Sequence, residues 1–234
     1  MRSIVLALLA IAACQNASGG PPKPSDKPSD RFGHDMTVRL HMHENFGLLR
    51  TIELEIIHGR LAAAQALALA IGETPDEPGL EPFAKRAAAV RARAAELANA
   101  RDIAEACRRE AKLAAACADC HVDAGVLPEF SPPPREPPDH PTVRSRMVRH
   151  LWASERMWEG LVGDSDESWR AGLDILAATP LPFADKTDER APLAAKLQQL
   201  ARDATQTQAT DQLRDRARWY GDMLATCAAC HATR

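Results

Sequence analysis

The feature that most constrains the fold of this chain is an internal repeat. The motif Cys-x-x-Cys-His occurs at 117–121 and again at 227–231, so the two copies are 227 − 117 = 110 residues apart. A Thr-Val-Arg segment followed by a methionine recurs at 37–42 and 142–147, an offset of 142 − 37 = 105 residues. Because self-similarity at a fixed period indicates duplicated structural units, the chain is predicted to contain two units of similar structure.

A proline-rich stretch separates the two units. Residues 122–139 include six prolines, a content that excludes regular helix and regular sheet. The sequence therefore predicts a first unit over residues 35–121, a linker over 122–139 and a second unit over 140–234.

Each unit is predicted to consist of four helices. Alanine is abundant and aromatic residues make up only 4% of the chain, a composition that favours helices over sheets. Apolar residues recur every three to four positions, and Asp102 stands where a helix N-cap is expected. Four helices joined by short loops bury a core most simply as an up-down-up-down bundle. The predicted fold class is therefore all-α, with two tandem four-helix bundles and the repeated motif on the last helix of each.

The Cys-x-x-Cys-His motif is the attachment signature of c-type haem. Its two thiols add across the two vinyl groups of the haem, and the adjacent imidazole ligates the iron. Small disulfides or a thioredoxin-like redox pair are the alternative, but neither requires a histidine after the second cysteine in both copies. The chain is therefore predicted to bind two covalent haem c groups through Cys117, Cys120, Cys227 and Cys230, with His121 and His231 as axial ligands of the iron.

A four-helix bundle with this motif near the end of its last helix resembles the cytochrome c′ family and its low-spin relatives. The resemblance covers both repeats and rests on helix order and motif position rather than on residue identity. It implies that the haem lies against the bundle and that a residue of the first helix faces the other side of the iron. In c′-like members that residue is not a ligand and small gases can bind. In the low-spin relatives it is a methionine and the site transfers electrons.

Both units place a methionine at the matching position of the first helix. Met42 and Met147 are therefore predicted to be the distal iron ligands, although methionine at helical spacing also serves as a core filler. His150, three residues after Met147, and His43, beside Met42, are the alternative distal ligands.

Arginines also recur at matching positions. Arg39 and Arg144 are candidates to pair with a haem propionate, because a guanidinium suits a carboxylate. A charged face on the solvent side of the helix is the alternative explanation.

The first residues predict export and a lipid anchor. Arg2 precedes an apolar run over 4–13 that is too short to span a bilayer and is typical of a signal peptide, here residues 1–13. The segment Ala12-Ala13-Cys14 resembles the bacterial lipobox, so Cys14 is the predicted lipidation site; an ordinary cleavage site is the alternative. Residues 14–34, rich in proline and serine, form a predicted disordered tether. The prediction is a periplasmic protein anchored to a membrane, with the outer membrane favoured.

The net charge, the remaining cysteine and the absence of other known motifs bear on which functions are possible. The net charge of −3 gives no indication of nucleic-acid binding. Cys107 is left over after one lipid site and four thioethers, and is predicted to be a small buried side chain. The sequence shows no Ser/His/Asp arrangement, no glycine loop for phosphate and no zinc pattern beyond the motif cysteines.

These observations favour an electron carrier rather than an enzyme. The predicted function is a lipid-anchored dihaem c-type cytochrome that passes single electrons between redox protein partners in the bacterial envelope. A cytochrome c′-like protein that binds or senses NO or CO through a five-coordinate haem is the main alternative. A peroxidase-like enzyme and a disulfide-stapled lipoprotein without haem are further ones, and a homodimer is left open.

Overall fold

The computed structural model describes residues 36–75, 78–126, 128, 130, 134–183, 187–206 and 212–232. Within these residues all regular secondary structure is helical, which confirms the predicted all-α fold class. The predicted signal peptide, the lipidation site Cys14 and the tether up to residue 34 lie outside the described residues. The helices are α2 (Met36–Ile57), α3 (Leu61–Glu73), the 3₁₀ turn η1 (Glu81–Phe83), α4 (Ala84–Ala98), α5 (Ile103–Ala124), α6 (Val143–Val162), α7 (Asp166–Ala178), α8 (Arg190–Gln206) and α9 (Gln212–Ala232).

Helix boundaries follow local capping chemistry. The Asp102 side chain accepts a hydrogen bond from the backbone N–H of Glu105 at 2.7 Å, which confirms the predicted N-cap of α5. Thr142 caps α6 in the same way. At the other end of α5, Gly125 adopts a left-handed conformation with φ 65°, the usual helix stop. The helix that carries the first motif therefore continues to Ala124. Among the helices of the described residues, none combines the length and the apolar character that crossing a bilayer demands.

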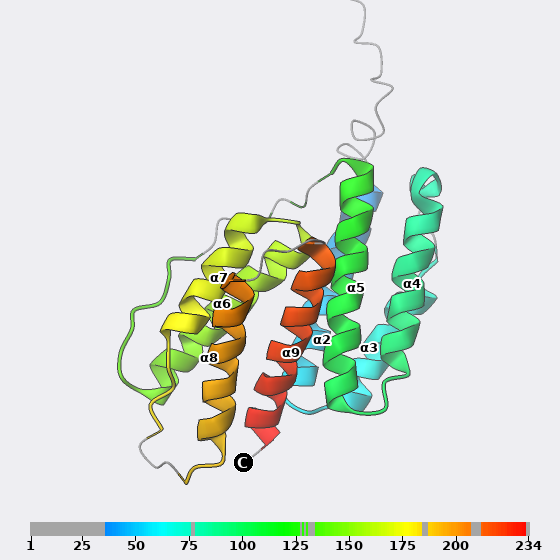
Figure 1. Cartoon of the computed structure of the whole chain (residues 1–234). Coiled ribbons are helices and arrows are strands. Elements are labelled where there is room, and N and C mark those ends of the chain that lie inside the picture. The colour runs from blue at the N-terminus through cyan, green and yellow to red at the C-terminus, as the bar shows by residue number, and fades with distance from the viewer. Residues whose placement is uncertain are drawn as a thin grey trace, which may run out of the picture.

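The two halves of the chain meet along their last helices. α5 packs against α9, and the two run antiparallel, so that their C-terminal ends lie at opposite ends of the molecule (Figure 1). A small residue permits the close approach, because a Cβ atom on Gly221 would lie 3.1 Å from the Cα atom of Arg108. Both α2 and α6 contact α5 and α9. The centre of the molecule is therefore built from the first and last helices of both halves.

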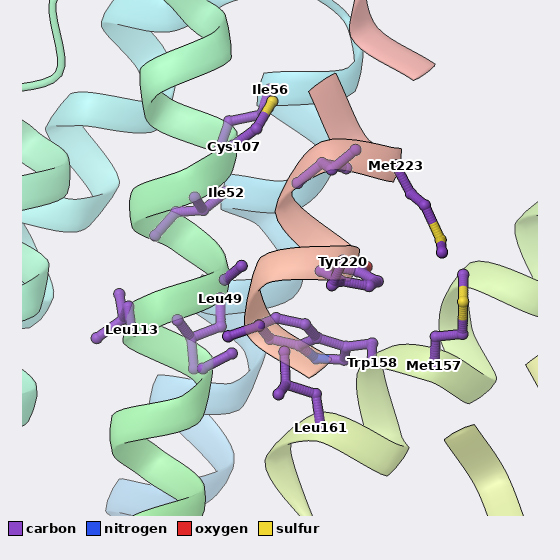
Figure 2. Packing of buried hydrophobic residues seen from close by; sticks show 14 of the residues in the cluster. Leu49, Ile52, Ile56, Cys107, Leu113, Met157, Trp158, Leu161, Tyr220 and Met223 are labelled. Carbon is purple, nitrogen blue, oxygen red and sulfur yellow. The ribbon is translucent and has the colours of Figure 1, made fainter. Parts of the chain in front are cut away.

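The hydrophobic core is continuous through this central contact. Figure 2 shows Trp158 of α6 and Leu49 of α2 lying close to Tyr220 of α9. The rings of Trp158 and Tyr220 are 5.8 Å apart between centroids. The two repeats thus share one core, because the apolar faces of α5 and α9 cover each other.

The described part of the linker is held against the helices. The Phe130 ring lies 5.6 Å from that of Phe46 in α2, measured between centroids. The Trp152 indole N–H donates to the carbonyl of Pro134 at 2.9 Å. These contacts attach the connection between the halves to both α2 and α6.

Candidate haem-attachment sites

The first motif occupies the last two turns of α5. Cys117, Cys120 and His121 are each partly exposed. Residues three apart on a helix lie on one side of it, so both sulfurs face in the direction that attachment to a single haem requires. None of the five cysteines in the described residues forms a disulfide bond.

The His121 ring is oriented by the other half of the chain. Its Nδ1 atom lies 3.3 Å from the carbonyl oxygen of Val162 at the C-terminal end of α6. Because a carbonyl oxygen can only accept, Nδ1 carries the proton and Nε2 keeps its lone pair. Burial lowers the pKa of His121, and the hydrogen bond to Val162 opposes this effect. The result is a neutral imidazole in the tautomer that ligates a metal through Nε2.

The second motif lies in the last turns of α9, with Cys227, Cys230 and His231 partly exposed. The His231 ring stands edge-on to the ring of His58, with centroids 6.1 Å apart. His58 directly follows α2, and with the repeat offset it corresponds to position 58 + 105 = 163, next to the Val162 that contacts His121. Each motif histidine therefore lies beside the end of the first helix of the other half.

The two thiols of each motif differ in their surroundings. Burial raises the pKa of Cys117 and of Cys227 to about 12. Burial also raises the pKa of Cys120, but the guanidinium of Arg86 at the start of α4 opposes this rise. Arg190 at the start of α8 acts in the same way on the pKa of Cys230. A neighbouring cation favours the thiolate, which is the reactive form.

Large apolar side chains are exposed on the helices that flank each motif. In the first turns of α2, Met36 and Leu40 are 74% and 57% exposed, and Val122, next to His121 in α5, is 47% exposed. On the first turns of α6, Val143 and Leu151 are exposed as well. Exposed apolar patches on a protein surface mark binding sites for ligands or partners. The first helix of each half therefore presents large apolar side chains to the solvent.

The sequence-predicted methionines lie on the expected helices. Met42 in α2 and Met147 in α6 are half-buried, and both remain predictions as iron ligands. His43 is exposed. Arg39 and Arg144 are also exposed, which agrees with the alternative that they form a charged, solvent-facing side of the helix. Their pairing with a haem propionate remains a prediction.

His150 is engaged elsewhere in the structure. It is buried, and its Nε2 atom lies 2.7 Å from the carbonyl oxygen of Thr179, to which it donates. Burial lowers its pKa, the hydrogen bond to Thr179 opposes this, and the charges of Arg146 and Arg149 lower the pKa further. Iron ligation through Nε2 would cost His150 this hydrogen bond. Met147 is therefore the better distal candidate in the second half.

Sequence reasoning missed a buried polar cluster at the centre of the molecule. Glu53 of α2 and Glu110 of α5 are completely or almost completely buried. The signal was present, because Glu53 lies among Leu49, Ile52 and Ile56 on an apolar stripe, where a charged residue is not expected. That Glu53 belongs to a buried cluster can be recognised only when the helices that cover it are known.

No protein-family model, curated protein or solved structure matches this chain. Within the described ranges, no three histidine, cysteine, aspartate or glutamate side chains gather as a metal-ion site.

Proposed function

We propose that this chain is a dihaem c-type cytochrome that passes single electrons between redox protein partners of the bacterial envelope. The observation that carries the proposal is the pair of Cys-x-x-Cys-His motifs, each on the last turns of a helix that ends one half of the chain. The motif cysteines form no disulfide bond, His121 has the tautomer that leaves Nε2 able to ligate a metal, and the first helix of each half exposes apolar side chains; all three observations support the proposal.

Each half is proposed to form one haem-binding four-helix unit. In the first, α2, α3, α4 and α5 pack in chain order and α2 also contacts α5. In the second, α6 to α9 pack in the same order and α6 contacts α9. This ring of contacts is what a four-helix bundle requires.

The bound haem supplies the one-electron redox chemistry. Cys117 and Cys120 hold one group and Cys227 and Cys230 the other, while His121 and His231 provide the proximal nitrogen. Met42 and Met147 provide the distal sulfur in this proposal, and methionine opposite histidine raises the reduction potential relative to two histidines. The flanking apolar side chains keep water from the ligands.

The helix pairing supports electron transfer within the chain. Cys227 is close enough to Cys107 that a charge on it would raise the pKa of Cys107, so the second motif begins near a residue ten positions before Cys117. Ten residues of α-helix span about 15 Å. The two attachment points are therefore separated by a short, protein-filled path along the α5–α9 contact.

Anchoring at Cys14 is proposed on the sequence alone. A lipid at that residue and the tether up to residue 34 would hold the cytochrome at the periplasmic side of a bacterial membrane, within reach of redox partners.

The methionine ligands give the proposal a direct optical test. We expect the oxidised protein to show low-spin spectra with a methionine-to-iron band, and carbon monoxide to leave the reduced spectrum unchanged. Met42→Ala and Met147→Ala should each remove about half of the band, because each takes the sulfur from one iron. Leu54→Ala, twelve residues after Met42 on α2 and 40% exposed, is the control and should change nothing. A high-spin spectrum that shifts with carbon monoxide would contradict the electron-carrier function and support a gas-binding function instead.

A further inference from the structure

The contact between the two halves encloses a hydrogen-bonded carboxylate. Glu53 of α2 accepts hydrogen bonds from the hydroxyl of Tyr220 in α9 and, at 2.7 Å, from the hydroxyl of Ser154 in α6. Its second oxygen forms an ion pair with Arg50, which also reaches the partly exposed Glu155 at 3.3 Å. Glu53 is thus fully satisfied, and its partners form a polar connection toward the solvent.

Glu110 lies in the same cluster but has a different environment. It is fully buried in α5, and neither carboxylate oxygen has a hydrogen-bond partner. Burial, and then the negative charge of Glu53, raise the pKa of Glu110 well above its usual range, whereas Arg50 acts in the opposite direction. A carboxyl group with no fixed partner responds strongly to any change in nearby charge, because the low-dielectric interior screens that change weakly.

The cluster lies between the two haem-attachment sites. Glu110 is seven residues before Cys117 on the same face of α5, which corresponds to about 10 Å along the helix axis. Electrostatic interactions connect Glu110 with Cys117 on one side, and Glu53 with Cys227 on the other. The carboxyl pair therefore lies within electrostatic range of one cysteine of each motif.

We propose that Glu110, beside Glu53, is a proton-binding site coupled to electron transfer. At a pH between the pKa of Glu110 in the oxidised chain and its higher pKa in the reduced chain, one proton from the solvent binds the Glu110 carboxylate when an electron enters from a redox partner. When the electron leaves for the next partner, the proton returns to the solvent. One O–H bond forms and breaks, and charge balances within the buried region. The inference rests on the proposed function, because the electron must reside at the motifs.

Several other titratable groups face the region around Glu110 and Arg50. Burial raises the pKa of Cys107 and of Tyr220, which keeps these groups protonated, and in the haem-loaded chain Cys117 and Cys227 would be thioethers that bind no proton. Arg50 stays charged. α6 adds Glu155, Arg156 and Glu159 around Arg50. α3 and α4 contribute buried apolar side chains, namely Ala64, Ala68, Ala94 and Leu97.

The decisive measurement is the midpoint potential of the haem-loaded full chain as a function of pH. We expect the potential to fall as the pH rises in the unaltered protein, because reduction binds a proton. Glu110→Gln keeps the shape of the side chain and removes the proton site, so the slope should disappear. Glu105→Gln, on the same helix, should retain it, because Arg101 lowers the pKa of Glu105 to about 2 and keeps that group ionised. Equal slopes in all three proteins would overturn the proposal while leaving haem attachment intact.

A second readout tests proton binding by Glu110 independently of the haem. A carboxyl group whose folded-state pKa is raised binds more protons in the folded than in the unfolded chain, so stability falls as the pH rises above about 4.3. The urea midpoint of the unaltered chain should therefore decline over this range, and Glu110→Leu should show a flatter profile. If the unaltered chain and Glu110→Leu have the same pH profile, Glu110 is not a proton-binding site. If the profiles differ but the purified protein contains no haem, the proton site stands and only the proposed function is refuted.

Discussion

A chain that carries Cys117→Ala together with Cys120→Ala is expected to hold one covalently bound haem where the unaltered chain holds two. Both thioether bonds of the first site are lost, and no other cysteine of the described residues lies on the last two turns of α5. The intact mass of the denatured protein should fall by one haem, and the haem absorbance per chain should halve. Cys227→Ala with Cys230→Ala should do the same at the second site.

Cys107→Ala is the matched control for this experiment. Cys107 is on the same helix, ten residues before Cys117, and it is fully buried. Burial raises its pKa, so its thiol is unreactive as well as inaccessible. This variant should retain two haems. Loss of haem from Cys107→Ala, or two haems on the double variant, would contradict the assignment of the motifs.

Removing one haem also tests how far the halves depend on each other. The ring of His121 is positioned by Val162, and that of His231 stands beside His58, so each motif uses the opposite half. The shared core also makes the two halves depend on each other, because Trp158 and Tyr220 pack against helices of the first half (Figure 2). Haem loss at one site is therefore expected to shift the spectrum of the other site slightly, without releasing its haem.

The helices were predictable from the sequence because each buries one apolar stripe. In the third helix of the first half, Pro82 suits a first helical turn, and the turn Glu81–Phe83 leads directly into Ala84–Ala98. The N-cap at Asp102 was predictable because a short acidic side chain satisfies the first free N–H groups of a helix. The positions of helices and their caps depend on neighbouring residues in the sequence, so the periodicity of the sequence is enough to predict them.

The pairing of helices was not predictable in the same way. A stripe shows which face of a helix is buried, but not which helix covers it. The antiparallel contact of α5 with α9 therefore became visible only in the structure, as did the proximity of Glu53 to Glu110. The motif residues could be identified because their chemistry lies in five consecutive positions, whereas the carboxyl cluster joins residues more than fifty positions apart.

The repeat explains why the cluster is asymmetric. By the offsets of the two repeats, Glu110 corresponds to 110 + 110 = 220, a tyrosine, and Glu53 to 53 + 105 = 158, a tryptophan. Equivalent positions thus hold two carboxyl groups in one half and two aromatic rings in the other. The hydroxyl of Tyr220 donates to Glu53, so each half supplies one side of the same buried hydrogen bond. A symmetric centre of four carboxylates would be much less stable, because their charges would repel in the interior.

The largest loss of stability is expected from Gly160→Ala, where α6 crosses α7. A Cβ atom at this position would lie 2.7 Å from the Cα atom and 2.8 Å from the Cβ atom of Trp169, and the backbone of α7 cannot move aside without disturbing the core. Overpacking of this kind typically costs about 3 kcal/mol at its upper end. The midpoint of urea unfolding should fall accordingly, with the slope of the transition unchanged.

Gly47→Ala is the control, because Gly47 also lies within a helix, α2, but a Cβ atom there would meet nothing within 4 Å. Alanine favours the helical conformation over glycine by about 1 kcal/mol, so this variant should unfold at a higher urea concentration than the unaltered chain. The opposite signs of the two changes separate the effect of the crossing from that of helix propensity. Equal midpoints in both variants would show that α6 and α7 do not approach as closely as Gly160 and Trp169 indicate.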